Sequence, residues 1–151
     1  MPTTVTGLDE IRALAGQDLG VSSWTDIPQS RVDAFADATD DHQWIHTDPE
    51  RAKDGPFGGA IAHGYLTLAM LIPLWSEILE MKGIGMAVNY GLNRVRFPAP
   101  VPAGARIRAT GKLTSVDDVP GGVQVTADVV IEIENGSKPA CAAQPVLRYY
   151  A

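Results

Sequence analysis

An uncharged stretch near the middle of the chain constrains its fold more than any other feature. Residues 55–76, GPFGGAIAHGYLTLAMLIPLWS, contain no Asp, Glu, Lys or Arg. A helix that is apolar on every side needs protein around it, so we expect a buried central helix over about residues 60–81. Pro73 should kink or interrupt this helix, because proline removes a main-chain donor and crowds the preceding turn. The glycines and Pro56 favour a buried helix over a membrane span.

From about residue 85 onward the pattern becomes typical of β-strands. Four segments are rich in β-branched residues and mostly alternate between apolar and polar positions: residues 85–97, 105–116, 122–134 and 141–150. The sequences PAPVPAG and DDVPGG between them are typical of turns. The sequence GVSSWTDI, residues 20–27, indicates one further strand.

One architecture accounts for both the five long antiparallel strands and the helix that is apolar on every side. A strongly bent sheet that wraps around the helix covers the helix on all sides. We therefore predict an α+β protein with the arrangement of the hot-dog fold. Such a sheet leaves an open edge that a second copy of the chain would cover, so we expect a homodimer.

The first half of the chain predicts three further helices. Residues 8–15 have apolar side chains at helical spacing. Residues 28–39 begin with Pro28, which suits the first turn of a helix. Asp48 followed by proline is a strong helix start, so PERAKD, residues 49–54, should form a short helix.

Composition bounds the class of protein. Of the 151 residues, 45% are hydrophobic and 20% are charged, and no repeat or linker divides them, so we expect one domain over residues 1–151. The net charge of −6 argues against nucleic acid as a partner, because phosphate binding needs a basic face. Cys141 is the single cysteine, and the N-terminus has no signal-peptide pattern. Both features favour the cytoplasm.

The segment TDDHQWIHTDP, residues 39–49, contains two of the three histidines. On a continuous helix Asp41 and His46 would lie about 140° apart, so they meet only if the chain leaves the helix between them. We expect Trp44 and Ile45 to pin such a loop against the core. A carboxylate and an imidazole held together can orient a water molecule and move its protons at neutral pH. Spacing alone is also compatible with an ordinary surface turn.

A second candidate element is His63-Gly64, at the expected start of the central helix. A helix N-terminus presents free N–H groups, and glycine lets a ligand approach the main chain closely. Gly64 is therefore a candidate oxyanion donor for a thioester carbonyl, although tight helix–sheet packing explains this glycine equally well. The spacing of His42 and His46 could suit a metal, but no third ligand is nearby in sequence, so we expect no metal.

Together these segments resemble a known family. The strings TDDHQWIHTDPERAKDGPFGGAIAHGYLTLAM and NRVRFPAPVPAGARIRA are similar to MaoC-like (R)-specific enoyl-CoA hydratases. The hydratase-2 motif of that family is Gly-Asp-x-Asn-Pro-Ile/Leu-His-x-Asp-Pro, followed by an Ile-x-His-Gly helix start and a Pro-Val-x-x-Gly turn. The resemblance covers roughly residues 20 to 150.

The resemblance implies a function and a site. It implies a hot-dog homodimer of fatty acid metabolism that adds water to trans-2-enoyl-CoA and forms the (R)-3-hydroxyacyl product, without cofactor or metal. It places the catalytic pair on Asp41 and His46, and the glycine whose N–H binds the thioester oxygen on Gly64.

The chain departs from the family motif at three positions. Asp40, Gln43 and Trp44 stand where the family has Gly, Asn and Pro. Gln43 keeps an amide, and Trp44 can still hold the loop. Asp40 is a second acid beside Asp41, and we expect it to face solvent or to cap the preceding helix.

Two other functions stay open. A hot-dog acyl-CoA thioesterase would also use an acid to activate water, and a non-catalytic acyl-thioester-binding subunit would keep the fold alone. Four arginines are candidates for CoA phosphate contacts, although arginines on a strand more often form its solvated face: Arg94, Arg96, Arg106 and Arg108. Leu66 and Met70 are candidates for an acyl tunnel, or plain core.

Overall fold

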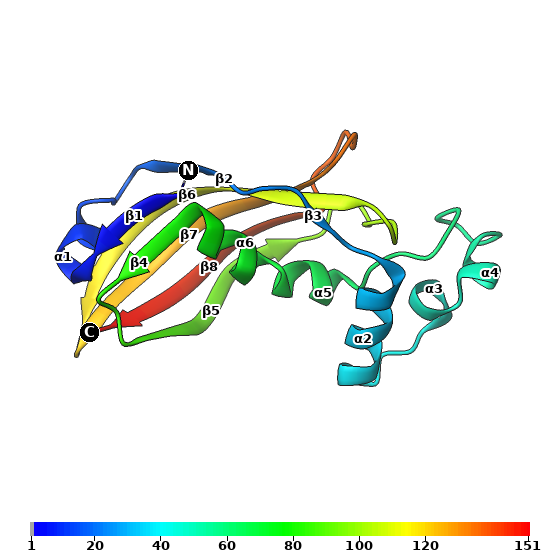
Figure 1. Ribbon diagram of the computed structural model, residues 1–151, viewed down its shortest axis with the longest axis horizontal. Helices are drawn as coiled ribbons and strands as arrows, with labels where there is room; N and C mark the ends of the chain where they lie inside the picture. Colours follow the sequence, from blue (N-terminus) through cyan, green and yellow to red (C-terminus); the bar gives the residue numbers. More distant parts are fainter. Residues whose placement is uncertain (1) are drawn as a thin grey trace.

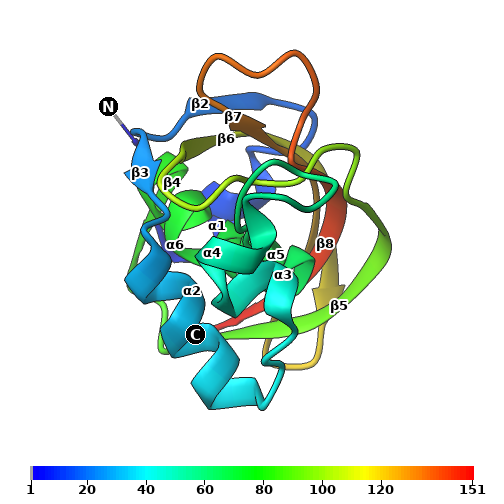
Figure 2. The ribbon, with the colours of Figure 1, turned by 90° about the vertical axis from the view of Figure 1, so that its right-hand side faces the viewer.

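The computed structural model describes residues 2–151. Its elements, in chain order, are β1 (Thr3–Thr6), α1 (Gly7–Arg12), β2 (Asp18–Val21), β3 (Thr25–Asp26), α2 (Gln29–Thr39), α3 (Trp44–Thr47), α4 (Pro49–Ala52), α5 (Gly64–Ala69), α6 (Leu71–Ile78), β4 (Leu79–Lys82), β5 (Met86–Arg96), β6 (Arg106–Val119), β7 (Gly122–Ile133) and β8 (Cys141–Tyr150). The long strands form one curved sheet around α5 and α6 (Figures 1 and 2).

The main sheet is antiparallel, with the strand order β2-β6-β7-β8-β5, and β3 also pairs with β6. Alternation along β7 explains which face is covered, because successive side chains of a strand point to opposite sides. The buried residues of β7 include every second position from Val123 to Ile131, and those side chains face the helices. The four long strands expected from the sequence are all present.

The central helix is two short helices instead of one over residues 60–81. It breaks at Met70, between α5 and α6, and Pro73 lies three residues later in the first turn of α6. Pro73 has no N–H to donate to the carbonyl of Ala69, and its ring crowds that carbonyl, so the expected interruption falls one turn before the proline.

Both ends of the expected helix are extended. Ile61 forms a β-bridge with Pro102, and the helix begins only at Gly64. Residues 79–82 form β4, which pairs in parallel with the unexpected strand β1. Pairing between segments this far apart in the chain overrides the local apolar pattern. No helix within residues 2–151 has the length and hydropathy needed to cross a membrane.

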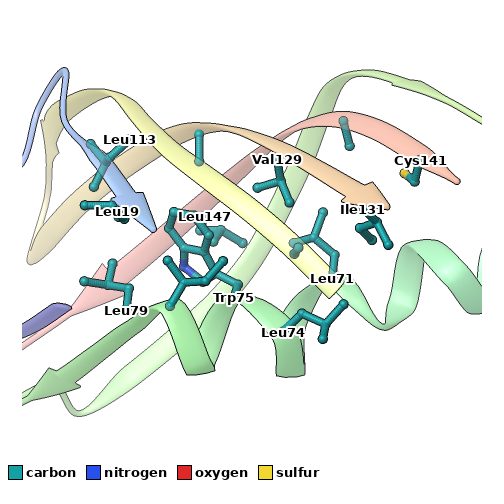
Figure 3. Packing of buried hydrophobic residues seen from close by; sticks show 14 of the residues in the cluster. Leu19, Leu71, Leu74, Trp75, Leu79, Leu113, Val129, Ile131, Cys141 and Leu147 are labelled. Carbon is teal, nitrogen blue, oxygen red and sulfur yellow. The ribbon is translucent and has the colours of Figure 1, made fainter. Parts of the chain in front are cut away.

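The core lies between α6 and the concave face of the sheet. Leu71, Leu74 and Trp75 project from α6 toward strand residues such as Leu113 and Leu147 (Figure 3). This packing buries each of these side chains almost completely.

A hydrogen bond and a glycine fix the position of Trp75. Its indole N–H donates to the Tyr149 hydroxyl at 3.0 Å, which ties α6 to β8. Gly111 of β6 lies beneath the same ring, where an added Cβ would come within 2.7 Å of it.

The elements of the first half match the expectations with shifted ends. The Asp48 side chain accepts from the main-chain N–H of Arg51 and begins α4, as predicted. The strand expected over residues 20–27 is split into β2 and β3. Ser22 lies at the split, where its hydroxyl, in place of a carbonyl, accepts from Ala109 N–H. Helices α2, α3 and α4 lie beyond one end of the sheet, near the start of α5 (Figure 1).

Candidate active site

The turn after α2 brings the candidate catalytic residues together. The helix ends at Thr39, and Asp40 has φ of 60° in the left-handed region, so the chain leaves α2 just before Asp41. The expected break thus lies one residue earlier than the stretch between Asp41 and His46, and His46 stands on the short helix α3 instead of in a loop. Glycine adopts this conformation without strain and Asp tolerates it, which explains how Asp40 can stand where the resembling family has Gly. Asp40 is exposed and ends α2, in agreement with the prediction.

Asp41 and His46 form a cluster with a residue that the sequence reasoning did not assign to the site. A carboxylate oxygen of Asp41, one ring nitrogen of His46 and one ring nitrogen of His63 lie within 4.8 Å of one another. Both histidines are buried, whereas Asp41 is exposed. His63 directly precedes Gly64 in the Ile-x-His-Gly segment. Its place in that segment is the sequence feature that could have predicted that His63 lies in the site.

Main-chain hydrogen bonds fix the His46 ring. Its Nδ1 lies 2.7 Å from the carbonyl oxygen of Ile61, and the Ile61 N–H donates to the carbonyl of Ile45 at 2.9 Å. A carbonyl only accepts, so Nδ1 carries the proton and Nε2 keeps its lone pair. The pKa of His46 lies below its usual value, mainly because burial disfavours the charged ring. His46 is therefore held as a neutral base.

The loop is not pinned in the way expected from the sequence. Trp44 and Ile45 are only half-buried and are not part of the core. Trp44 packs against Gly55, and the guanidinium of Arg51 lies 4.3 Å from its ring. Because α3 and α4 lie beyond the end of the sheet, the Trp44 ring packs on its own loop, and main-chain hydrogen bonds hold His46 instead.

The His63 ring lies between two other rings. It stacks on His46 with 3.9 Å between centroids and 23° between planes, and Phe35 lies 4.8 Å away on a tilted plane. With Asp41, the two histidines supply the three ligands that a metal would need. Lone pairs lie in the plane of an imidazole, however, and nearly parallel planes do not direct them to one ion. The absence of a metal stays a prediction.

Gly64 is the first residue of α5, and its N–H donates to no acceptor within residues 2–151. It lines a cavity of about 330 Å³ together with His46 and Thr67. An added Cβ at Gly64 would lie 3.1 Å from the ring of Phe97, which lines the same cavity. The structure thus brings two of the three predicted site residues to one cavity, and Gly64 both packs against Phe97 and lines that cavity.

The other candidates are distributed differently. Three of the four candidate arginines face carboxylates of the sheet: Arg94 faces Asp128, Arg106 faces Glu134 and Arg108 faces Glu132. Arg96 contacts no carboxylate within the part of the chain that the structure describes. Leu66 and Met70 line a groove of about 500 Å³ beside Phe35, apart from the Gly64 cavity.

Comparison with known proteins decides the family. Residues 10–135 match the MaoC like domain family. The chain belongs to this family. Solved structures with the same architecture confirm the hot-dog fold. One is an (R)-hydratase from A. caviae involved in PHA biosynthesis, with a TM-score of 0.72 and 24% identity over 88% of this chain and 94% of that one.

Relatives of this MaoC-like chain indicate its reaction class. The 3-hydroxyacyl-thioester dehydratase Z of Mycobacterium tuberculosis is 52% identical over 149 residues, which are 98% of this chain and 99% of the relative. This MaoC-like chain is accordingly an enzyme of the hydro-lyase class. A further structural neighbour comes from the ChsH1-ChsH2 complex of Mycobacterium tuberculosis, with a TM-score of 0.69 and 19% identity over 88% of this chain and 95% of that one.

Proposed function

We propose that this MaoC-like enzyme adds water reversibly to a trans-2-enoyl-CoA and forms the (R)-3-hydroxyacyl-CoA. The main support is that a carboxylate oxygen of Asp41 lies within 4.8 Å of a ring nitrogen of His46. His46 is neutral, is held by the Ile61 carbonyl and lines the same cavity as Gly64. The name of the dehydratase Z relative supports an acyl thioester substrate of fatty acid metabolism. The family resemblance supports the proposed (R) configuration, and the name of the A. caviae neighbour is in line with it.

In the proposed hydration, Asp41 and His46 hold one water molecule. The Nε2 lone pair of His46 accepts a proton as the water oxygen bonds to the β-carbon, and the Asp41 carboxylate orients the water by accepting its second hydrogen. The π electrons of the double bond move to the α-carbon and the thioester oxygen. The imidazolium then returns its proton to the α-carbon, which restores neutral His46. Dehydration is the same sequence in reverse.

The thioester oxygen becomes negative during this reaction. The free N–H of Gly64 at the start of α5 would donate to that oxygen, and the positive end of the helix dipole adds to the effect. Glycine leaves the main chain accessible from the cavity, because no Cβ covers the N–H. The CoA carrier would find at Arg96 a cation that pairs with no carboxylate among residues 2–151, whereas the other three candidate arginines already face carboxylates.

The proposed assembly is a homodimer formed at β5. This strand is an edge of the sheet, and it exposes the large apolar residues Met86, Val88, Tyr90 and Leu92. An exposed apolar edge invites pairing with another strand, and a second copy presents the same edge. We further propose that the enzyme needs no cofactor and acts in the cytoplasm, where the buried thiol of Cys141 stays reduced.

A substrate assay with two compounds tests the function. With trans-2-enoyl-CoA, we expect loss of the enoyl absorbance without release of free thiol, and chiral analysis should give the (R)-3-hydroxyacyl product. Thiol release from a saturated acyl-CoA would identify a thioesterase instead. Tight acyl-CoA binding without turnover at any enoyl chain length would identify a non-catalytic subunit.

A further inference from the structure

We infer that His63 is a positioning residue that holds Asp41 and His46 in one geometry. This inference rests on the proposed hydration. Asp41 follows the exposed end of α2, and no hydrogen bond to its carboxylate holds it within residues 2–151. A group that grips a water molecule needs a fixed position, because a misplacement of about 1 Å costs about a hundredfold in rate.

One hydrogen bond provides that position for Asp41. The Nε2 atom of His63 lies 2.9 Å from the main-chain carbonyl oxygen of Asp41, and since a carbonyl only accepts, Nε2 carries the proton. His63 itself is held by α5, because its carbonyl accepts the N–H of Thr67 in the first turn. The bond therefore ties the exposed turn after α2 to the start of α5.

Ring stacking provides the second half of the role. His63 is 2% exposed and lies against the His46 ring, while the tilted ring of Phe35 also contacts it. The same buried ring of His63 thus contacts both residues: it hydrogen-bonds to the main chain of Asp41 and stacks on the ring of His46. In neither contact does His63 touch the water or the substrate of the proposed reaction, so it acts through Asp41 and His46.

The second ring nitrogen of His63 shows that packing is not the whole explanation. While Nε2 donates to Asp41, Nδ1 is buried without a hydrogen-bond partner within residues 2–151. A buried polar atom without a partner costs about 1–3 kcal/mol. An apolar side chain of similar size would fill the space without this cost. What only the histidine supplies is the Nε2 donor to Asp41.

Substitutions at His63 separate the donor from the bulk. His63→Gln keeps an amide N–H near the position of Nε2, whereas His63→Leu keeps most of the volume and removes the donor. We expect His63→Leu to lower kcat of the hydration by about 10–100-fold with KM within about threefold of the parent, and His63→Gln to recover most of the loss. His42→Leu is the matched control and should keep the parent kcat, because His42 is exposed in the same turn and its ring lies 3.8 Å from the Asp37 carboxylate, outside the cluster of Asp41, His46 and His63.

Two results would overturn the inference in an active enzyme: a His63→Leu kcat within threefold of the parent, or a His63→Gln kcat no better than that of His63→Leu. A readout without substrate keeps the inference testable if a variant does not fold or if the parent hydrates no enoyl-CoA. Nitrogen NMR of the intact parent should show His63 protonated on Nε2 and His46 protonated on Nδ1. Protonation of His63 on Nδ1 would overturn the inference, because Nε2 could not then donate to Asp41. Failure of the proposed function appears instead as a parent without turnover.

Discussion

At the scale of single residues, the adjacent acids Asp40 and Asp41 have different surroundings. Only Asp41 lies in the cluster with His46. Asp41→Asn and His46→Asn should each lower kcat of the hydration by about 10²–10⁴-fold, the usual contribution of a positioned acid–base group. The double variant should lose much less than the product of both losses, because the two residues hold one water. Asp40→Asn is the control, and its kcat should stay within about tenfold of the parent. If Asp40→Asn abolishes hydration while Asp41→Asn keeps the parent rate, the catalytic acid is Asp40 and not Asp41.

The state of His46 predicts a pH dependence. Burial lowers the pKa of His46 below 6.5, so the neutral base persists into mildly acidic solution. The acid limb of the kcat/KM profile should therefore have its midpoint below pH 6.5. Between the lowered pKa and 6.5 the unfolded chain binds more protons than the folded chain, so the His46 contribution makes stability fall as pH falls through this window. A midpoint above 6.5 in the rate profile would show that His46 is not the group observed.

Gly64 can be tested against a neighbouring glycine. Gly64→Ala places a methyl group beside the free N–H and 3.1 Å from the Phe97 ring. Phe97 is 39% exposed and its ring can move outward, so we expect a kcat loss of about 10–100-fold with a small shift in Tm. Gly59→Ala has open space around the new methyl group and should change neither quantity. Unfolding of Gly64→Ala would assign Gly64 to packing.

At the scale of elements, the bond between Trp75 and Tyr149 joins α6 to β8. Burial raises the pKa of Tyr149 to about 12, so its hydroxyl stays neutral and accepts from the indole N–H. Tyr149→Phe leaves that buried N–H without a partner and should reduce the free energy of unfolding by about 1–3 kcal/mol. Tyr150→Phe removes a hydroxyl that makes no hydrogen bond within residues 2–151, so urea unfolding should show a change below about 0.5 kcal/mol. Equal losses at both positions would contradict a role for the bond.

At the scale of the whole molecule, the two edges of the sheet differ in their apolar exposure. We expect a homodimer at micromolar concentration by light scattering, and Leu92→Lys on β5 should shift it toward monomer by placing a charge in the interface. Val21→Lys on β2 is the control, because Val21 is an exposed apolar residue on the opposite edge. A parent that is a folded monomer, or a dimer lost only in Val21→Lys, would contradict pairing at β5.

The amino-acid sequence by itself determined the features that depend on nearby residues. Alternation predicted the four long strands, the uncharged stretch predicted a buried helical centre, and Asp48 with the following proline predicted the start of α4. The family motif placed Asp41 and His46 in one candidate site, and the left-handed φ of Asp40 ends α2 just before Asp41. These features follow from periodicity, capping and main-chain conformation, which a few neighbouring residues are enough to set.

The tertiary structure alone decided the features that join distant parts of the chain. The apolar pattern did not show that residues 79–82 leave the helix, because their partner is β1, at residues 3–6. Nor did it show which nitrogen of His46 is protonated, because the carbonyl of Ile61 decides it from 15 positions away. His63 lies 22 positions after Asp41 in the sequence, and its ring reaches the site because it directly precedes α5. Contacts of this kind depend on where the folded chain brings the residues, and no local pattern encodes them.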